Sequence, residues 1–185
     1  MSVLLSVAST AGLPALSLRP WQADDATALV AAHRDPAMRR WLMTVINSEA
    51  DARRWIDSQQ LGWASGTRFG FAVSENDDAG SGPPVGHVTV KLNDSGGAEV
   101  GYWTAADVRG RGLASRALEA AVGWVLASGS SVPVVRLELF HAVDNRASCR
   151  VAERCGFDLE AVLPARPPAF PSEGHLHVRT DSARP

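Results

Sequence analysis

The segment 109–114 places two glycines between a strand pattern and the longest apolar helix pattern of the chain. Residues 98–104 before it alternate as a strand does, and apolar residues recur at helical spacing over 113–126 after it. The first amides of a helix have no partner within the helix, and they add to the positive end of its dipole. Because Gly110 and Gly112 let a ligand approach closely, the segment predicts an anion site suited to a pyrophosphate.

Two common phosphate-binding loops do not fit this segment. The dinucleotide fingerprint opens a βαβ unit and is followed by an acidic residue about 20 positions on, whereas this turn follows an antiparallel meander and has no such residue. The P-loop needs Gly-Lys-Ser/Thr, which is absent. Arg109 and Arg111 are expected to add positive charge at the rim of the turn.

Hydrophobic periodicity and turn residues divide the rest of the chain into three regions: helices first, a β-meander second and alternating strands and helices third. Ser48 and Asp51 form a capping-box-like start for one helix of the first region. We expect a strand at 16–19, helices beginning near 25, 36 and 49, a meander over 68–104 with a loop at 76–84, strands at 134–140 and 157–163, a helix at 147–155 and a closing strand at 175–179.

Composition narrows the class of protein. The chain has 185 residues, 45% of them hydrophobic, and a formal net charge of -2, which is typical of a soluble globular domain and disfavours general nucleic-acid binding. The uncharged stretch 1–18 contains Ser, Thr, Gly and Pro and is no membrane span, and it lacks the basic start of a signal peptide. We expect a loose leader at 1–15, one domain at 16–180, a tail at 181–185 and a cytoplasmic location.

Cysteine and histidine spacing gives no indication of a metal site. Cys149 and Cys155 lie six apart in one predicted helix, and a CxxC zinc site is excluded. His175 and His177 project to the same side of a strand, but no acidic or cysteine partner stands in register with them. We therefore expect surface histidines and no metal.

The segment 109–114 matches the pattern Arg/Gln-x-x-Gly-x-Gly/Ala after a strand and into a helix, and with further motifs it resembles the GNAT acyltransferase superfamily. The resemblance covers 16–163 and is greatest for the branch of ribosomal-protein alanine N-acetyltransferases. The further motifs are Leu18-Arg19-Pro20, Asp35-Pro36, Arg40-Trp41-Leu42, Glu99 to Trp103, Asn145-x-x-Ser148, Cys155-Gly156-Phe157 and Glu160.

The resemblance implies an α/β fold with a mixed, mostly antiparallel sheet of six or seven strands and helices on both faces. It also implies acetyl-CoA as cosubstrate, with its pyrophosphate on the turn and its pantetheine against the strand before it. In this family the residue at Asn145 holds the pantetheine, although helix capping alone also explains an Asn there. The implied cofactor-binding residues are Trp103, Thr104, Val108, Arg109, Gly110, Arg111, Gly112, Leu113, Ala114, Asn145 and Ser148.

The acceptor amine determines how strong a base the reaction needs. An α-amine with a pKa near ~7.8 is partly neutral at neutral pH, whereas a Lys amine near ~10.4 is almost wholly charged. The resemblance places Glu160 on the strand under the site as the first candidate base, and Glu99 is the second, each acting through water. Each could instead be a solvated carboxylate. The family's usual acid is a Tyr, but Tyr102 lies on another element, so Ser148 or solvent is expected to protonate the thiolate.

These features predict an enzyme that acetylates a primary amine, either a protein N-terminus or a small amine, in a direct ternary complex without metal. A GNAT-fold acyl-CoA-binding module without turnover is one alternative. A succinyl-CoA-dependent enzyme is another, because Arg146 and Arg150 flank Ser148 and could bind a carboxylate. Neither nucleic acid nor membrane is an expected partner, and a homodimer is compatible with this assignment.

Overall fold

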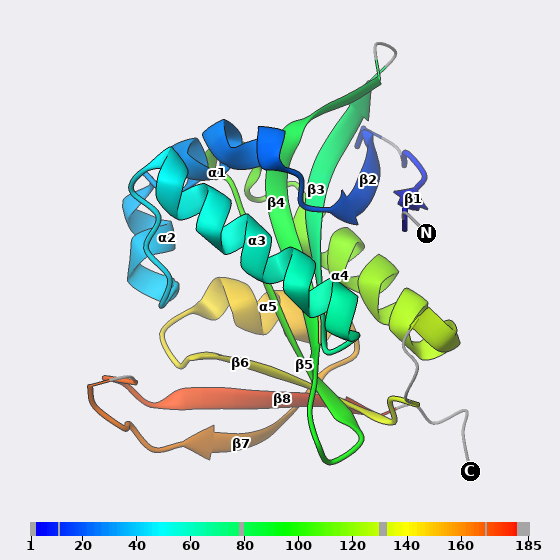
Figure 1. Ribbon diagram of the computed structural model, residues 1–185. Coiled ribbons are helices and arrows are strands. Elements are labelled where there is room, and N and C mark those ends of the chain that lie inside the picture. Colours follow the sequence, from blue (N-terminus) through cyan, green and yellow to red (C-terminus); the bar gives the residue numbers. More distant parts are fainter. Residues whose placement is uncertain (1–2, 11, 78–79, 130–132, 169, 181–185) are drawn as a thin grey trace.

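The computed structural model describes residues 3–180 apart from residues 11, 78–79, 130–132 and 169. Figure 1 shows the elements. In chain order they are β1 (Leu5–Val7), β2 (Ala15–Pro20), η1 (Ala23–Asp25), α1 (Ala26–Ala32), α2 (Pro36–Trp41), α3 (Glu49–Ser65), β3 (Arg68–Asp77), β4 (Gly80–Leu92), β5 (Gly97–Thr104), η2 (Ala106–Val108), α4 (Leu113–Trp124), the π-helical turn η3 (Val125–Gly129), β6 (Arg136–Ala142), α5 (Arg146–Arg154), β7 (Asp158–Leu163) and β8 (Gly174–Thr180). Within the described residues, no helix is long and apolar enough to cross a membrane.

The strands form one mixed sheet in the order β1-β2-β3-β4-β5-β6-β8-β7. All neighbouring strands are antiparallel except β5 and β6, which are parallel. The predicted fold class is confirmed, with eight strands in place of six or seven. The additional strand is β1, which pairs with β2 at Leu5–Val7, so the segment expected to be a loose leader contributes an edge strand.

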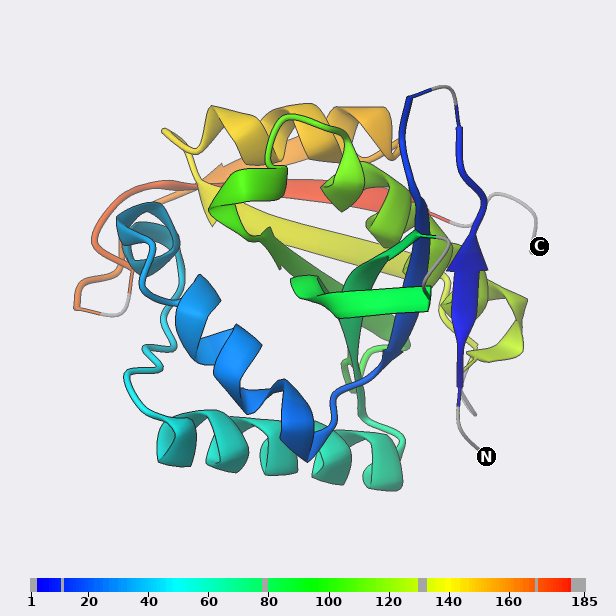
Figure 2. The same ribbon diagram turned by 90° about the horizontal axis from the view of Figure 1, so that it is seen from above.

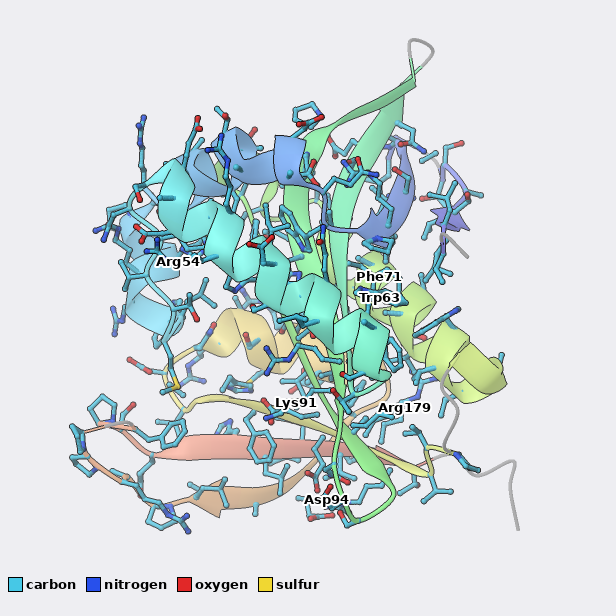
Figure 3. The ribbon with its side chains drawn as sticks, viewed as in Figure 1. Arg54, Trp63, Phe71, Lys91, Asp94 and Arg179 are labelled. Atoms are coloured by element: carbon cyan, nitrogen blue, oxygen red, sulfur yellow. The ribbon has the colours of Figure 1, made fainter. Side chains whose placement is uncertain are left out.

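Helices cover both faces of the sheet (Figure 2). On one face, α1 and α3 enclose a core that includes Trp21, Leu29 and Ile56, all at most 1% exposed. On the other face, α4 and α5 pack on β3 to β6 over a larger core. Trp63 of α3 and Phe71 of β3 lie side by side in Figure 3, with ring centroids 5.1 Å apart. The sheet is therefore buried on both sides over its central strands.

Local signals explain the helix starts near the site. Asp35 caps α2 by accepting a hydrogen bond from the Ala37 amide at 3.0 Å, and Pro36 takes the first helical position, where its missing N–H costs nothing. Ser48 and Asp51 form the predicted capping box at the start of α3. These caps fix the helical arm that faces the sheet.

The hairpin of β3 and β4 and the closing strand differ from the sequence prediction. Residues 76–84 were expected to be a loop, but β3 continues to Asp77 and β4 begins at Gly80, while residues 78–79 lie outside the described part. Antiparallel pairing between the two strands continues into the segment that was expected to be a loop. The closing strand β8 runs over Gly174–Thr180 and inserts between β6 and β7, which makes β7 the edge of the sheet. The tail at 181–185 lies outside the described residues.

Candidate functional site

An opening in the sheet lies between the two parallel strands β5 and β6. They pair over four residues each, from Gly97 with Arg136 to Val100 with Leu139. Beyond Val100, among the described residues, β5 has no strand partner on that side, while β6 continues along β8 to Ala142. The backbone of Trp103 and Thr104 therefore forms an edge at which an extended ligand can add main-chain hydrogen bonds.

The glycine-rich turn begins where this edge ends. Val108 is 3% exposed and anchors η2 in the core, and Gly110 and Gly112 then adopt φ angles of 77° and 75°. Only glycine adopts this left-handed conformation without cost. Gly112 is the N-cap of α4, and because it has no side chain it leaves the first amides of that helix to a ligand. The turn has the geometry that an anion site requires.

Both arginines of the turn are engaged in ion pairs. Arg109 pairs with Asp35, the cap of α2, and Arg111 contacts both carboxylate oxygens of Glu75 at 2.7 and 2.9 Å. The expected positive rim is thus largely neutralised, because acidic partners come from α2 and β3. Burial opposes ionisation of Asp35, but hydrogen bonds from Ala37 and Arg109 lower the pKa of its carboxyl overall. The arginines hold the turn against the rest of the fold.

The first turn of α5 faces the opening. Asn145 caps this helix, with its Oδ1 accepting a hydrogen bond from the Ser148 amide at 3.3 Å. The capping interpretation of Asn145 is therefore confirmed, and its contact with a pantetheine stays a prediction. Ser148 is half-buried in the same turn.

Tyr102 spans the opening from β5 to α5. Its hydroxyl donates a hydrogen bond to the Ser148 carbonyl at 3.4 Å, and burial raises the pKa of Tyr102 to about 12. Sequence reasoning set this residue aside because it lies on another element than the family's Tyr. Alternation along β5 was the available signal: Val100 and Tyr102 pack on the core of the α4 and α5 face, so the ring points toward α5.

On the opposite face of β5, a pocket of about 300 Å³ lies between the helical arm and the sheet. Trp103 and Trp55 contribute aromatic walls, and Glu99 contributes a carboxylate. Thr89 adds a buried hydroxyl that has no hydrogen-bond partner within the described residues. The remaining lining residues are His33, Leu42, Met43, Thr44, Gln59, Arg68, His87, Lys91, Gly101 and Tyr102, of which Lys91 is labelled in Figure 3.

His87, one of two buried histidines that line this pocket, is a poor proton acceptor. His87 Nδ1 lies 3.0 Å from the Trp21 indole nitrogen, which can only donate a hydrogen bond, and 3.0 Å from the Phe71 carbonyl oxygen, which can only accept one. Burial lowers the pKa of His87 to about 4. Among the residues that line this pocket, Glu99 is the carboxylate.

Glu160 does not lie at the opening. It sits exposed on the edge strand β7, where its carboxylate oxygens accept from Arg136 at 3.0 and 2.6 Å. Arg136 is opposite Gly97, at the paired end of β5 and β6. The hydrogen bonds from Arg136 lower the pKa of Glu160, which weakens it as a base. This placement favours the solvated edge carboxylate over the expected catalytic role, and the difference arises because β8 inserts between β6 and β7.

The expectation of surface histidines on the closing strand is wrong. His177 is 2% exposed, and His175 lies with its Nδ1 3.4 Å from the Sγ of Cys149. The cysteine partner that was missing from the strand comes from α5, which packs across β8. Sequence register within one strand could not reveal it.

Comparisons with known proteins agree with this geometry. The family model of the acetyltransferase (GNAT) domain matches residues 15–158. No curated protein matches the chain.

Solved structures with the same fold include three whose descriptions name a ligand or a substrate class. The microcin C7 self-immunity acetyltransferase MccE, in complex with acetyl-CoA and AMP, is 18% identical, with a TM-score of 0.78 and coverage of 90% of this chain and 92% of that one. The alpha-N-protein acetyltransferase RimL, in complex with coenzyme A, is 19% identical, with a TM-score of 0.80 and coverage of 98% and 100%. A putative ribosomal-protein-serine acetyltransferase from Vibrio cholerae is 24% identical, with a TM-score of 0.74 and coverage of 95% and 97%.

The matched residues run from β2 to the start of β7, so they include the glycine-rich turn, the separated strands and the first turn of α5. The predicted resemblance is confirmed over more than half of the sequence. This chain belongs to the GNAT acetyltransferase family.

Proposed function

We propose that this protein transfers the acetyl group of acetyl-CoA to a primary amine in a ternary complex. The observation that supports this most directly is the separation of β5 from β6 beyond Val100, immediately before a glycine turn that exposes the first amides of α4. The free strand edge suits a chain that contains amides, and the glycine turn next to it suits a pyrophosphate. Coenzyme A carries these two groups in the same order. MccE and RimL have been solved with acetyl-CoA and coenzyme A.

In this proposal the amides of Gly110 to Ala114 bind the pyrophosphate, and the pantetheine pairs with the backbone of Trp103 and Thr104. Because Arg109 and Arg111 are paired with carboxylates, the amides and the dipole of α4 supply most of the attraction. The thioester then reaches the first turn of α5, where Ser148 and Tyr102 meet.

The acceptor amine enters from the pocket on the other face of β5. Glu99 lies in that pocket and takes the proton of the ammonium through a water molecule. The amine nitrogen then attacks the thioester carbonyl carbon and releases its second proton to solvent, while the carbon–sulfur bond breaks and sulfur leaves with the electron pair. Because an α-amine has a pKa near ~7.8 and a Lys amine one near ~10.4, the α-amine needs a weaker base to become neutral, which favours a protein or peptide N-terminus over a Lys side chain.

Two hydroxyl groups can stabilise the departing thiolate. The pKa of Tyr102 is about 12, well above the ~8.5 of an ordinary thiol, so Tyr102 can donate a hydrogen bond to the thiolate without giving up its proton. Ser148 has the same capacity. The proton that finally neutralises the thiolate comes from solvent.

The proposal is tested in two steps. Thermal unfolding is measured with acetyl-CoA, free CoA and NAD; a ligand at about 100 times its dissociation constant adds about 2.7 kcal/mol, and we expect a shift with both CoA species and none with NAD. Release of free thiol is then followed with an unblocked peptide, the same peptide N-terminally acetylated, and a small polyamine. We expect turnover with the unblocked peptide alone. Binding without turnover on any amine would favour the acyl-CoA-binding module, and no shift with any CoA species would refute the cradle.

A further inference from the structure

Four potential metal ligands gather beneath the first turn of α5, and none of them has a part in the proposed acetyl transfer. They are His141 at the end of β6, His175 and His177 on β8, and Cys149 on α5. One ligand atom of each lies within 4.8 Å of the ligand atoms of the others. The three imidazole rings are mutually close, with centroids 5.1 to 5.8 Å apart. We refer to these residues as the His/Cys cluster.

Two of the imidazoles present an unprotonated nitrogen to the cluster. His141 Nδ1 lies 2.8 Å from the Ala142 carbonyl, and His177 Nδ1 lies 3.4 Å from the Phe157 carbonyl. A carbonyl oxygen can only accept, so each Nδ1 carries the hydrogen and each Nε2 keeps its lone pair. Metal-binding histidines are commonly oriented in this way, by a backbone carbonyl on the other ring nitrogen.

Both of these Nε2 atoms are buried without a hydrogen-bond partner within the described residues. His177 is itself 2% exposed, so its ring is shielded from bulk water. An unpaired buried polar atom typically costs about 1–3 kcal/mol of stability. A fold that contains two such atoms side by side is stabilised when a cation between them accepts both lone pairs.

The remaining two ligands complete a soft donor set. The Sγ of Cys149 lies 3.4 Å from His175 Nδ1, and both residues are half-buried at the rim of the cluster. Three imidazoles and a thiolate suit zinc, whereas magnesium and calcium prefer oxygen ligands.

We propose that the His/Cys cluster binds one Zn²⁺ ion through four protein ligands. Zinc–nitrogen bonds of about 2.0–2.1 Å and a zinc–sulfur bond of about 2.3 Å place tetrahedral ligand atoms roughly 3.3–3.6 Å apart. The separation between Cys149 Sγ and His175 Nδ1 already has this value, and all four ligand atoms lie within 4.8 Å of one another, so zinc binding requires the most distant of them to approach by little more than an ångström. Because all four positions are protein ligands, the site is structural.

Such an ion would fix α5 to the sheet. Cys149 belongs to the helix turn that also holds Asn145 and Ser148, and the three histidines belong to β6 and β8. Zinc would thus cross-link the two sides of the fold next to the opening. The site rests on its own side chains and does not depend on the acetyl-transfer proposal.

The test uses the full chain without a histidine tag, freed of metal with a chelator that is then removed. Zinc binding is measured by competition with a chromogenic chelator, and cobalt is substituted to record the visible bands of a tetrahedral site and the thiolate-to-cobalt charge-transfer band. Cys149→Ala and His175→Ala change half-buried residues and should preserve the fold. Cys155→Ala and His33→Gln change a buried cysteine and a buried histidine outside the cluster and serve as matched controls.

We expect one zinc per chain for the wild type and both controls, and a tetrahedral cobalt spectrum with a charge-transfer band. Loss of an outer partner of a zinc ligand typically weakens binding 10–100-fold, so loss of a ligand should weaken it by at least about 100-fold. Cys149→Ala should also abolish the charge-transfer band. At a hundredfold excess over Kd, zinc should raise the unfolding midpoint of the wild type by about 5 °C or more. Binding of less than one equivalent by the wild type, or equal affinity in both cluster variants, would refute the site.

Discussion

Replacing Gly112 with aspartate should abolish coenzyme A binding while the domain remains folded. Gly112 has a φ of 75°, and a Cβ added there meets no atom within 4 Å, so the cost of a side chain is conformational only. For a residue with a side chain, this conformation costs roughly 1–2 kcal/mol of stability, and the cost is smaller for Asp and Asn than for most residues. For a chain of this length that lowers the unfolding midpoint by only about 2–4 °C per kcal/mol.

The effect on binding is much larger. A carboxylate about 4 Å from one phosphate charge costs about 4 kcal/mol at the effective dielectric constant of a protein surface, which is roughly a 1,000-fold loss of affinity. Gly112→Asn is the matched control, because it has nearly the same shape and the same tolerance of positive φ but no charge. The difference between the two variants therefore isolates the electrostatic contribution.

The assay is calorimetric titration of acetyl-CoA into the wild type, Gly112→Asp and Gly112→Asn at two salt concentrations. Because salt screens exposed charges over about 10 Å at 0.1 M, the gap between the Asp and Asn variants should narrow at high salt. Equal affinity of the two variants, or wild-type affinity of Gly112→Asp, would show that the pyrophosphate does not lie on this turn.

Three further predictions concern catalysis and stability. Glu99→Gln should lower kcat at least about tenfold without weakening acetyl-CoA binding, whereas Glu160→Gln should leave kcat within about twofold. Steady-state kinetics of both variants test this assignment. A larger loss of kcat in Glu160→Gln than in Glu99→Gln would contradict it. Ser148→Ala and Tyr102→Phe should each lower kcat, with Ser148→Ala costing at least about tenfold, and if neither variant slows thiol release then neither hydroxyl stabilises the thiolate. Burial lowers the pKa of His87 from 6.5 to about 4, so between these pH values the unfolded chain binds a proton that the folded chain does not. The free energy of unfolding should therefore fall as the pH falls from 6.5 to about 4. Denaturant titrations should show that the free energy of unfolding of His87→Gln depends less on pH than that of the wild type.

Local signals predicted the elements of the fold well because each lies within a few residues of sequence. The capping box at Ser48 and Asp51, the first-position Pro36 and the two glycines before α4 act on the backbone next to them, and the structure has a helix boundary at each. The edge strand β1 was missed because three alternating residues after a loose start carry little periodic signal. This strand is stabilised by its pairing with β2, which is a tertiary contact that local periodicity does not show.

The site residues divide in the same way. The turn at Gly110 and Gly112 was predicted at the position where the structure has it, and the left-handed conformation of both glycines is a structural finding. Glu160 was misplaced because the insertion of β8 between β6 and β7 is a matter of topology. The His/Cys cluster was missed for a related reason: Cys149 and His175 are 26 residues apart and meet only when α5 packs across β8.

Electrostatics at the turn follows from contacts that no sequence window contains. Arg109 finds its partner Asp35 at a separation of 74 residues, and Arg111 finds Glu75 at a separation of 36. From sequence alone the two arginines indicate a cationic rim that attracts a phosphate by charge. Once both are paired, attraction must come from backbone amides that are fixed in place by the glycine conformations and by the ion pairs themselves. A neutralised rim also avoids a general affinity for polyanions, which agrees with the slightly acidic net charge of -2. In the proposed function the turn therefore selects an anion by the geometry of its amides, and net positive charge is not required.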